Sequence, residues 1–152
     1  MINNHKNSEL KIRRSEVGPW GMNAYVLVCS KTRKSVLVDP GAEPDALDKL
    51  LLKTEPIAII LTHSHSDHTG ALSEMRKRLK VPVMAHTGPH IDMMNLKTDR
   101  WLDHGALVRV GNQTINIYHT PGHTPDQICL VNEENHFAVV GDAIFDGGPG
   151  RT

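Results

Sequence analysis

The chain has 152 residues, with 17 Lys or Arg against 17 Asp or Glu, so its formal net charge is zero. This length predicts one domain with a hydrophobic core, and a hydrophobic fraction of 39% excludes a disordered chain. Balanced charge and few aromatic residues argue against a nucleic-acid or membrane-surface binder. Neither nucleic acid nor a membrane is therefore expected as a partner. The ten histidines are many for this length.

The amino terminus predicts a cytoplasmic protein. It has no apolar stretch typical of a secretory signal, and no apolar run approaches the roughly 18 residues needed to span a bilayer. Cys29 and Cys129 lie in apolar runs and are expected to be core thiols rather than a disulfide. We expect residues 1–9 to be flexible and residues 10–152 to form a single domain.

Hydrophobic periodicity predicts alternating strands and helices, which together indicate an α/β protein. In chain order we expect strands at 10–17, 24–29 and 35–38, a helix at 44–53, a strand at 57–61, a helix at 69–80 and a strand at 81–85. A short helix at 89–95 and strands at 107–110, 114–118, 127–131 and 137–140 follow. The helices are expected to cover sheet layers.

Four potential metal ligands follow the apolar strand at 57–61: His63, His65, Asp67 and His68. His63 and His65 are two residues apart, so in an extended segment both side chains point to one side, with about 7 Å between Cα atoms. Two imidazoles placed in this way can bind one ion. Asp67 and His68 lie where the chain turns into the next helix, which indicates a second metal position close by.

Two later segments have the same character. His123 lies in the loop Thr120–Pro125, where Pro and Gly on both sides restrict its direction, and Asp142 ends a strand after Gly141. Alone, each segment is as typical of an ordinary turn as of a metal site. Together with the first cluster they complete a ligand set for two metal ions.

In order and type, these motifs resemble those of the metallo-β-lactamase-fold hydrolases. The matching segments are Thr62–Gly70, Thr120–Pro125 and Gly141–Phe145. The chain is most similar to the glyoxalase II-like (hydroxyacylglutathione hydrolase-like) branch, in which the last motif continues into a Gly-Arg pair, here Gly150-Arg151. Asp39-Pro40-Gly41 resembles the Asp-x-Gly turn of the family. The resemblance implies an αββα sandwich.

The resemblance also implies a role for each matching residue. The ligands would be His63, His65 and His123 for the first metal, Asp67 and His68 for the second, and Asp142 as the bridging carboxylate. Asp39 would orient a ligand histidine, which metal sites commonly need. One or two zinc ions per chain are expected, with iron or manganese as the alternative.

Such a pair of ions lowers the pKa of a bound water to near 7, so that hydroxide attacks a carbonyl carbon. We therefore expect hydrolysis of a thioester or a related small acyl compound, with Asp67 available for proton transfer. A different interpretation uses His63, His123 and Asp142 as a facial triad for one Fe(II), as in the persulfide dioxygenases of the family. A third is a truncated metal-binding domain without catalysis.

The carboxyl terminus lacks one expected feature. Family members continue beyond the Gly-Arg pair to a last histidine that completes the second site, whereas here no histidine follows His136. We thus expect a fold that is truncated at its carboxyl end. Five other histidines are available as substitutes, and His119 is the best placed: His86, His90, His104, His119 and His136. Exposed sheet surface predicts a homodimer or a larger homo-oligomer.

Overall fold

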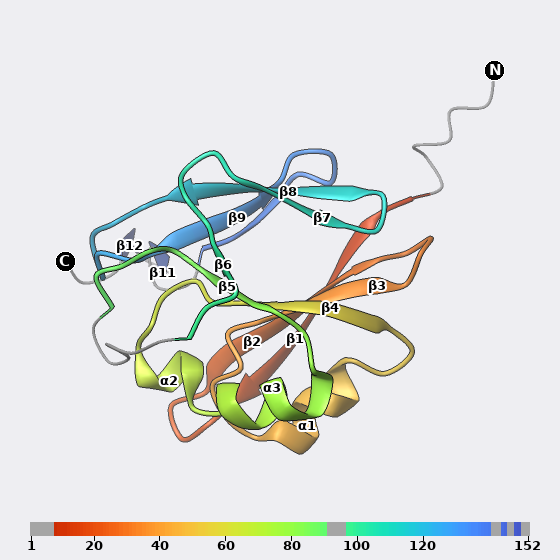
Figure 1. The fold of residues 1–152 in the computed structure, drawn as a ribbon, viewed down its shortest axis with the longest axis horizontal. Helices are drawn as coiled ribbons and strands as arrows, with labels where there is room; N and C mark the ends of the chain where they lie inside the picture. Colours follow the sequence, from red (N-terminus) through yellow and green to blue (C-terminus); the bar gives the residue numbers. More distant parts are fainter. Residues whose placement is uncertain (1–7, 91–96, 141–143, 146–147, 150–152) are drawn as a thin grey trace.

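The structure is a computed structural model that describes residues 8–90, 97–140, 144–145 and 148–149. Two β-sheets pack face to face, and the helices lie together on the outer face of the first sheet (Figure 1). The first sheet contains, in spatial order, β1 (Leu10–Val17), β2 (Met22–Cys29), β3 (Lys34–Val38), β4 (Glu55–Ile60), β5 (Val83–Ala85) and β6 (Arg100–Trp101). The helices are α1 (Pro44–Leu50), α2 (Ser66–Thr69) and α3 (Leu72–Leu79).

The second sheet is antiparallel and has the order β10-β9-β8-β7. Its strands are β7 (Leu107–Val110), β8 (Gln113–His119), β9 (Ile128–Asn132) and β10 (Phe137–Val139). A separate short pair joins β11 (Ile144–Phe145) to β12 (Gly148–Pro149).

The parallel part of the first sheet positions the site. Strands β3, β4, β5 and β6 run parallel, so their carboxyl ends share one edge of the sheet. Asp39 follows β3, His63 follows β4 by three residues, and His86 follows β5. Polar residues far apart in the sequence therefore gather at this edge.

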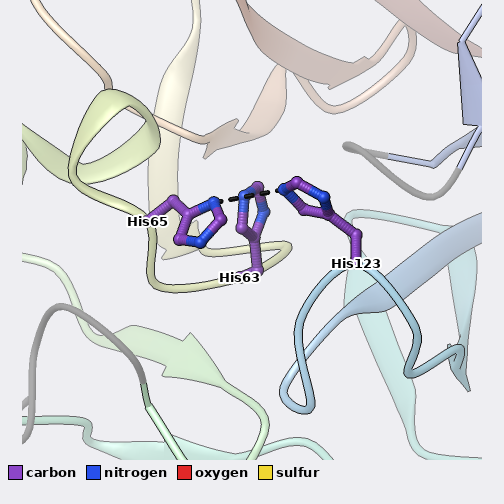
Figure 2. A group of neighbouring side chains, drawn as sticks. All are labelled: His63, His65 and His123. Atoms are coloured by element: carbon purple, nitrogen blue, oxygen red, sulfur yellow. Dashed lines mark hydrogen bonds between the residues drawn. The ribbon is translucent and has the colours of Figure 1, made fainter. Parts of the chain in front are cut away.

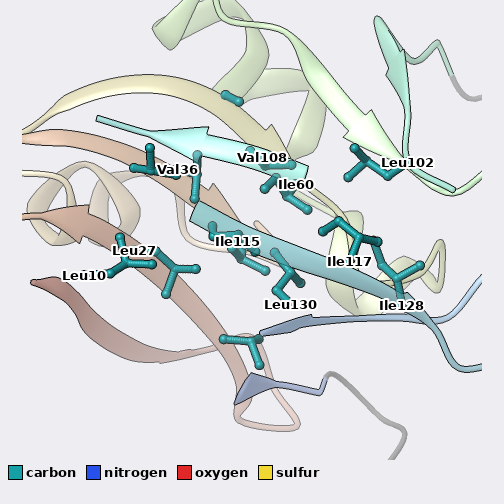
Figure 3. Packing of buried hydrophobic residues seen from close by; sticks show 14 of the residues in the cluster. Leu10, Leu27, Val36, Ile60, Leu102, Val108, Ile115, Ile117, Ile128 and Leu130 are labelled. Atoms are coloured by element: carbon teal, nitrogen blue, oxygen red, sulfur yellow. The ribbon is translucent and has the colours of Figure 1, made fainter. Parts of the chain in front are cut away.

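Two hydrophobic clusters hold the layers together. Leu27, Ile60, Ile115 and Leu130 belong to the cluster between the two sheets, and all four are fully buried (Figure 3). The other cluster joins the opposite face of the first sheet to the helices. The α/β prediction is confirmed. The helix, sheet and sheet layers of an αββα sandwich are present, while in the described part of the chain no helix covers the outer face of the second sheet.

The strand predictions hold to within two residues, but two helix predictions need correction. The helix expected at 44–53 ends at Leu50. The helix expected at 69–80 begins three residues later, as α3, and Thr69 instead ends the separate helix α2. Between them the chain turns at Gly70 and Ala71 and packs closely on the segment after β3: a Cβ at position 70 would lie 2.4 Å from the Gly41 carbonyl oxygen. The exposed two-residue strand β6 was not predicted.

Some predictions fall at the limits of the described residues. Residues 91–95 of the helix expected at 89–95 lie outside them, as do residues 1–7 of the expected flexible terminus. Ser8 is buried, and its hydroxyl accepts a hydrogen bond from Gln113 Nε2 (3.0 Å). Among the described residues, no helix is long and apolar enough to cross a membrane.

Candidate metal centre

The first part of the site is the segment that follows β4. Strand β4 ends at Ile60 in the core, and the chain remains buried through Leu61, Thr62 and His63. His65 is the residue directly before α2, with extended backbone angles (φ −59°, ψ 141°), so the side chains of His63 and His65 lie near each other, with ring centroids 5.0 Å apart. The predicted local arrangement of these two imidazoles is present.

His123 reaches these residues from the loop between β8 and β9. The backbone N–H of Ile128 donates to the Thr62 carbonyl oxygen (2.8 Å), which attaches this loop to the segment after β4. The ring of His123 then lies 5.6 Å from that of His63 and 4.8 Å from that of His65, between centroids (Figure 2). One potential ligand atom from each histidine lies within 4.8 Å of the other two.

The spacing of the ring nitrogens fits a metal ion. Nε2 of His123 and Nδ1 of His65 are 3.2 Å apart (Figure 2). Two nitrogens that each lie 2.0–2.1 Å from one tetrahedral ion are about 3.4 Å apart. The nitrogens of His65 and His123 therefore have the spacing that a divalent metal requires, with a nitrogen of His63 within 4.8 Å of them, and neutral imidazole is a preferred ligand of zinc and iron.

Asp39 organises a second group of potential ligands with His63 and His68, all of them buried. Its backbone is left-handed (φ 54°), a conformation that Asp tolerates better than most residues. One carboxylate oxygen accepts the Thr62 backbone N–H (2.8 Å). The other accepts the Thr62 hydroxyl (2.6 Å) and lies 3.0 Å from His68 Nδ1. Because a carboxylate only accepts, His68 carries a proton on Nδ1, and its neutral form therefore presents an unprotonated Nε2.

Thr62 connects Asp39 to His63 and so also determines the position of the proton on the His63 ring. Since the Thr62 hydroxyl proton is directed to Asp39, its oxygen is left to accept from His63 Nδ1, which lies 3.1 Å away. The neutral form of His63 therefore also presents Nε2 as the unprotonated nitrogen. Asp39 thus fixes the tautomers of two histidines, one directly and one through Thr62. The sequence analysis missed Thr62; a hydroxyl residue directly before the first histidine was the available signal.

The other predicted site residues are placed as follows. Asp67 lies in α2 but belongs to neither group of convergent ligand atoms. It borders a cavity of about 130 Å³ that is also lined by Trp20 and Met22. Asp142 lies outside the described residues, as does Arg151.

The substitute histidines do not join the described ligand groups. His119 stacks on His86 instead, with ring centroids 3.9 Å apart and planes 10° from parallel. Its Nε2 donates to the Pro125 carbonyl oxygen (2.8 Å), across the base of the His123 loop. His104 Nδ1 accepts the backbone N–H of His119 (3.0 Å). His90 stacks on Trp101.

Comparison with known proteins decides the family. Residues 17–152 match the model of the metallo-beta-lactamase superfamily. The chain belongs to the metallo-β-lactamase superfamily. Members of this superfamily bind divalent metals, and the three convergent imidazoles fit such a metal.

Individual relatives place the chain within the family. It is 35% identical to a hydroxyacylglutathione hydrolase of Bdellovibrio bacteriovorus over 84% of its own length, and it spans half of that protein. The solved structure of the BLEG-1 B3 metallo-beta-lactamase has a TM-score of 0.82 and 30% identity, covering 93% of this chain and 77% of that one. ETHE1 from Myxococcus xanthus has a TM-score of 0.80 and 27% identity, with coverage of 94% and 62%. The glyoxalase II resemblance is thereby confirmed at the level of homology.

Proposed function

We propose that the protein is a metal-dependent hydrolase that cleaves a thioester or a related small acyl compound, as glyoxalase II does. The observation that carries this proposal is the convergence of His63, His65 and His123, whose potential ligand atoms lie within 4.8 Å of one another. The homology to a hydroxyacylglutathione hydrolase supports the thioester as the substrate class.

We propose one or two zinc ions as the cofactor, with iron or manganese as alternatives. His63, His65 and His123 would hold the first ion; His68, Asp67 and Asp142 would contribute to the second. A divalent metal supplies Lewis acidity and a water of lowered pKa. The protein's part is to keep the imidazoles neutral and directed, and the hydrogen bonds from Thr62 and His68 to Asp39 support this role.

Asp67 is the proposed proton carrier. It is half-buried, borders a cavity of about 130 Å³ and belongs to neither group of convergent ligand atoms, which supports a place for its carboxylate beside a bound substrate. A thiolate leaving group needs little help from an acid, whereas an alkoxide needs a proton. Loss of Asp67 should therefore slow the hydrolysis of oxygen esters more than that of thioesters.

The test combines metal analysis with hydrolysis assays on the protein as purified. We expect one or two zinc ions per chain and hydrolysis of acyl thioesters. His63→Ala and His123→Ala should each abolish tight binding of the first ion. His136→Asn is the control, because His136 has a left-handed backbone (φ 55°) that Asn tolerates and belongs to neither ligand group. Unchanged metal content in both alanine variants would contradict the proposal.

A second candidate function is that of a mononuclear iron persulfide dioxygenase. The similarity to ETHE1 over 94% of the chain favours this candidate. His63, His123 and Asp142 would then form the facial triad. One iron per chain, with oxygen consumed in the presence of a persulfide and no thioester hydrolysis, would establish this function instead. Metal binding with neither activity would indicate a non-catalytic domain.

We also propose that the chain forms a homodimer or a larger homo-oligomer. Supporting this, Leu107 and Tyr118 expose 53% and 38% of their surface. They alternate with the buried Val108 and Ile117, so both lie on the outer face of the second sheet. Apolar side chains grouped on one sheet face favour association. A stable monomer in light scattering would contradict this part of the proposal.

A further inference from the structure

His119 is the last residue of β8 and lies at the base of the loop that carries His123. Its imidazole does not join the groups of convergent ligand atoms. Instead, its backbone and its half-buried ring contact three separate segments: the one after β5, the one before β7, and the far side of the His123 loop. These contacts link the first sheet to the loop of a proposed metal ligand.

The backbone of His119 is fixed by its neighbours on both sides. It pairs with Ile128 of β9 in the antiparallel ladder of the second sheet. Its N–H donates to Nδ1 of His104 (3.0 Å), which lies in the segment before β7. Because this nitrogen accepts, neutral His104 carries its proton on Nε2. The side chain of His119 therefore starts from a defined position.

The ring of His119 is oriented by His86. The two rings are stacked, with centroids 3.9 Å apart and planes 10° from parallel. His86 follows β5 and is itself held, because its Nδ1 accepts the Gly88 N–H (3.2 Å) and its carbonyl oxygen accepts from Nε2 of His90 (2.8 Å). Burial, and then the proximity of His119, lower the pKa of His86, so its ring is uncharged at neutral pH. The stack thus joins the end of β8 to the end of β5.

The oriented ring closes the loop that carries His123. Its Nε2 donates to the carbonyl oxygen of Pro125 (2.8 Å), and this nitrogen therefore carries the proton. Pro125 lies two residues beyond His123 and, as a proline, has no N–H through which the main chain could hold it. The main chain closes the loop further back, where the Thr120 N–H donates to the Gln127 carbonyl oxygen (2.9 Å). The side chain of His119 thus acts nearest to the ligand.

We propose that His119 is a positioning residue that directs His123 toward the first metal ion by holding Pro125 at the base of the loop. This inference rests on the proposed function, because it takes His123 as a metal ligand. The hydrogen bond between Thr120 and Gln127 involves no side chain and remains when His119 is replaced. Replacement should therefore loosen the tip of the loop around His123 and leave the loop attached to the sheet.

The first test measures zinc affinity by competition with a chromophoric chelator. His119→Phe keeps a flat ring that can stack on His86 and removes the donor to Pro125. We expect a loss of affinity of about three- to tenfold, which corresponds to one hydrogen bond. His119→Gln places an N–H at a similar distance from the backbone and should restore most of the affinity; without that recovery the inference fails. His119→Met, which also lacks the donor, should lose at least as much affinity and serves if His119→Phe does not fold.

Tyr118→Phe is the matched control. Tyr118 precedes His119 in β8, and its hydroxyl donates to Oε1 of Glu133 (3.3 Å), in the turn after β9 rather than in the His123 loop. This substitution removes one partly exposed hydrogen bond and keeps a ring, as His119→Phe does. Zinc affinity in Tyr118→Phe should stay within about twofold of the wild type, because one hydrogen bond is lost away from the ligands. Equal zinc affinities in the two phenylalanine variants would overturn the inference.

Amide hydrogen exchange of the metal-free protein separates positioning from general stability. In His119→Phe we expect faster exchange at Gly122, whose N–H donates to the Thr124 carbonyl oxygen within the loop (3.2 Å), and unchanged exchange at Ile117 in β8. Equal acceleration at both amides would refute the positioning role. Failure of the wild-type protein to bind metal would refute the proposed function and this inference together. Normal wild-type binding with no effect of His119→Phe on zinc affinity would refute the inference alone.

Discussion

Replacing Asp39 with Asn should weaken metal binding by changing the tautomers of two histidines. The carboxylate accepts three hydrogen bonds: from the Thr62 N–H, the Thr62 hydroxyl and His68 Nδ1. In Asp39→Asn the amide oxygen can still accept the Thr62 N–H, but the amide NH₂ faces the other two partners. His68 must then accept at Nδ1 and carry its proton on Nε2. The Thr62 hydroxyl turns to donate to His63 Nδ1, which also places the proton of His63 on Nε2.

The magnitude follows from the number of groups affected. Removing one group that supports a ligand typically costs 10- to 100-fold in metal affinity, or about 1.4–2.7 kcal/mol. Because Asp39 supports two histidines, we expect a loss near the upper end of that range. Backbone strain is not the cause, since Asn adopts the left-handed conformation at φ 54° as readily as Asp.

The assay is a zinc competition titration together with nitrogen-15 NMR of the histidine rings, which reports the protonated nitrogen directly. Asp126→Asn is the control, because Asp126 is equally buried and belongs to neither group of ligand atoms. The reasoning is refuted if Asp39→Asn binds zinc as the wild type does, or if its affinity falls while both histidines remain protonated on Nδ1.

Two further substitutions test the close packing at Gly41 and the pH dependence of the unfolding free energy. Gly41→Ala would place a Cβ 2.2 Å from the Asp67 carbonyl oxygen, so we expect about 1–3 kcal/mol of destabilisation in urea unfolding. An unfolding free energy equal to that of the wild type would contradict this prediction. Burial, and then the proximity of His119, lower the pKa of His86 from 6.5. The unfolded chain then binds a proton at His86 more readily than the folded protein does. The stability that neutral His86 contributes to the folded protein is therefore present above pH 6.5 and is lost as pH falls below it. His86→Phe should flatten that loss in the unfolding free energy; an unchanged pH profile would contradict the prediction.

The local half of the site could be predicted because it depends on neighbours in the sequence. His63 and His65 lie two residues apart in the segment that follows the buried strand β4, and this spacing predicts that both imidazoles lie near one another. The same holds for the strands, whose apolar alternation is visible in the sequence. The turn at Gly70 was not predictable in this way, because it depends on close packing against the carbonyl of Gly41, 29 residues earlier.

The other half depends on contacts between layers, for which the sequence carries no periodic signal. His123 reaches the site because Ile128 donates to Thr62, a hydrogen bond across 66 residues that joins the two sheets at one end. The motif around His123 indicates a ligand, but only this junction determines that it lies beside His63 and His65. The role of Thr62 escaped prediction for the same reason, since packing brings Asp39, 23 residues earlier in the chain, to its hydroxyl. Variants of Thr62 therefore probe the assembly of the site, whereas variants of the histidines probe only its ligands.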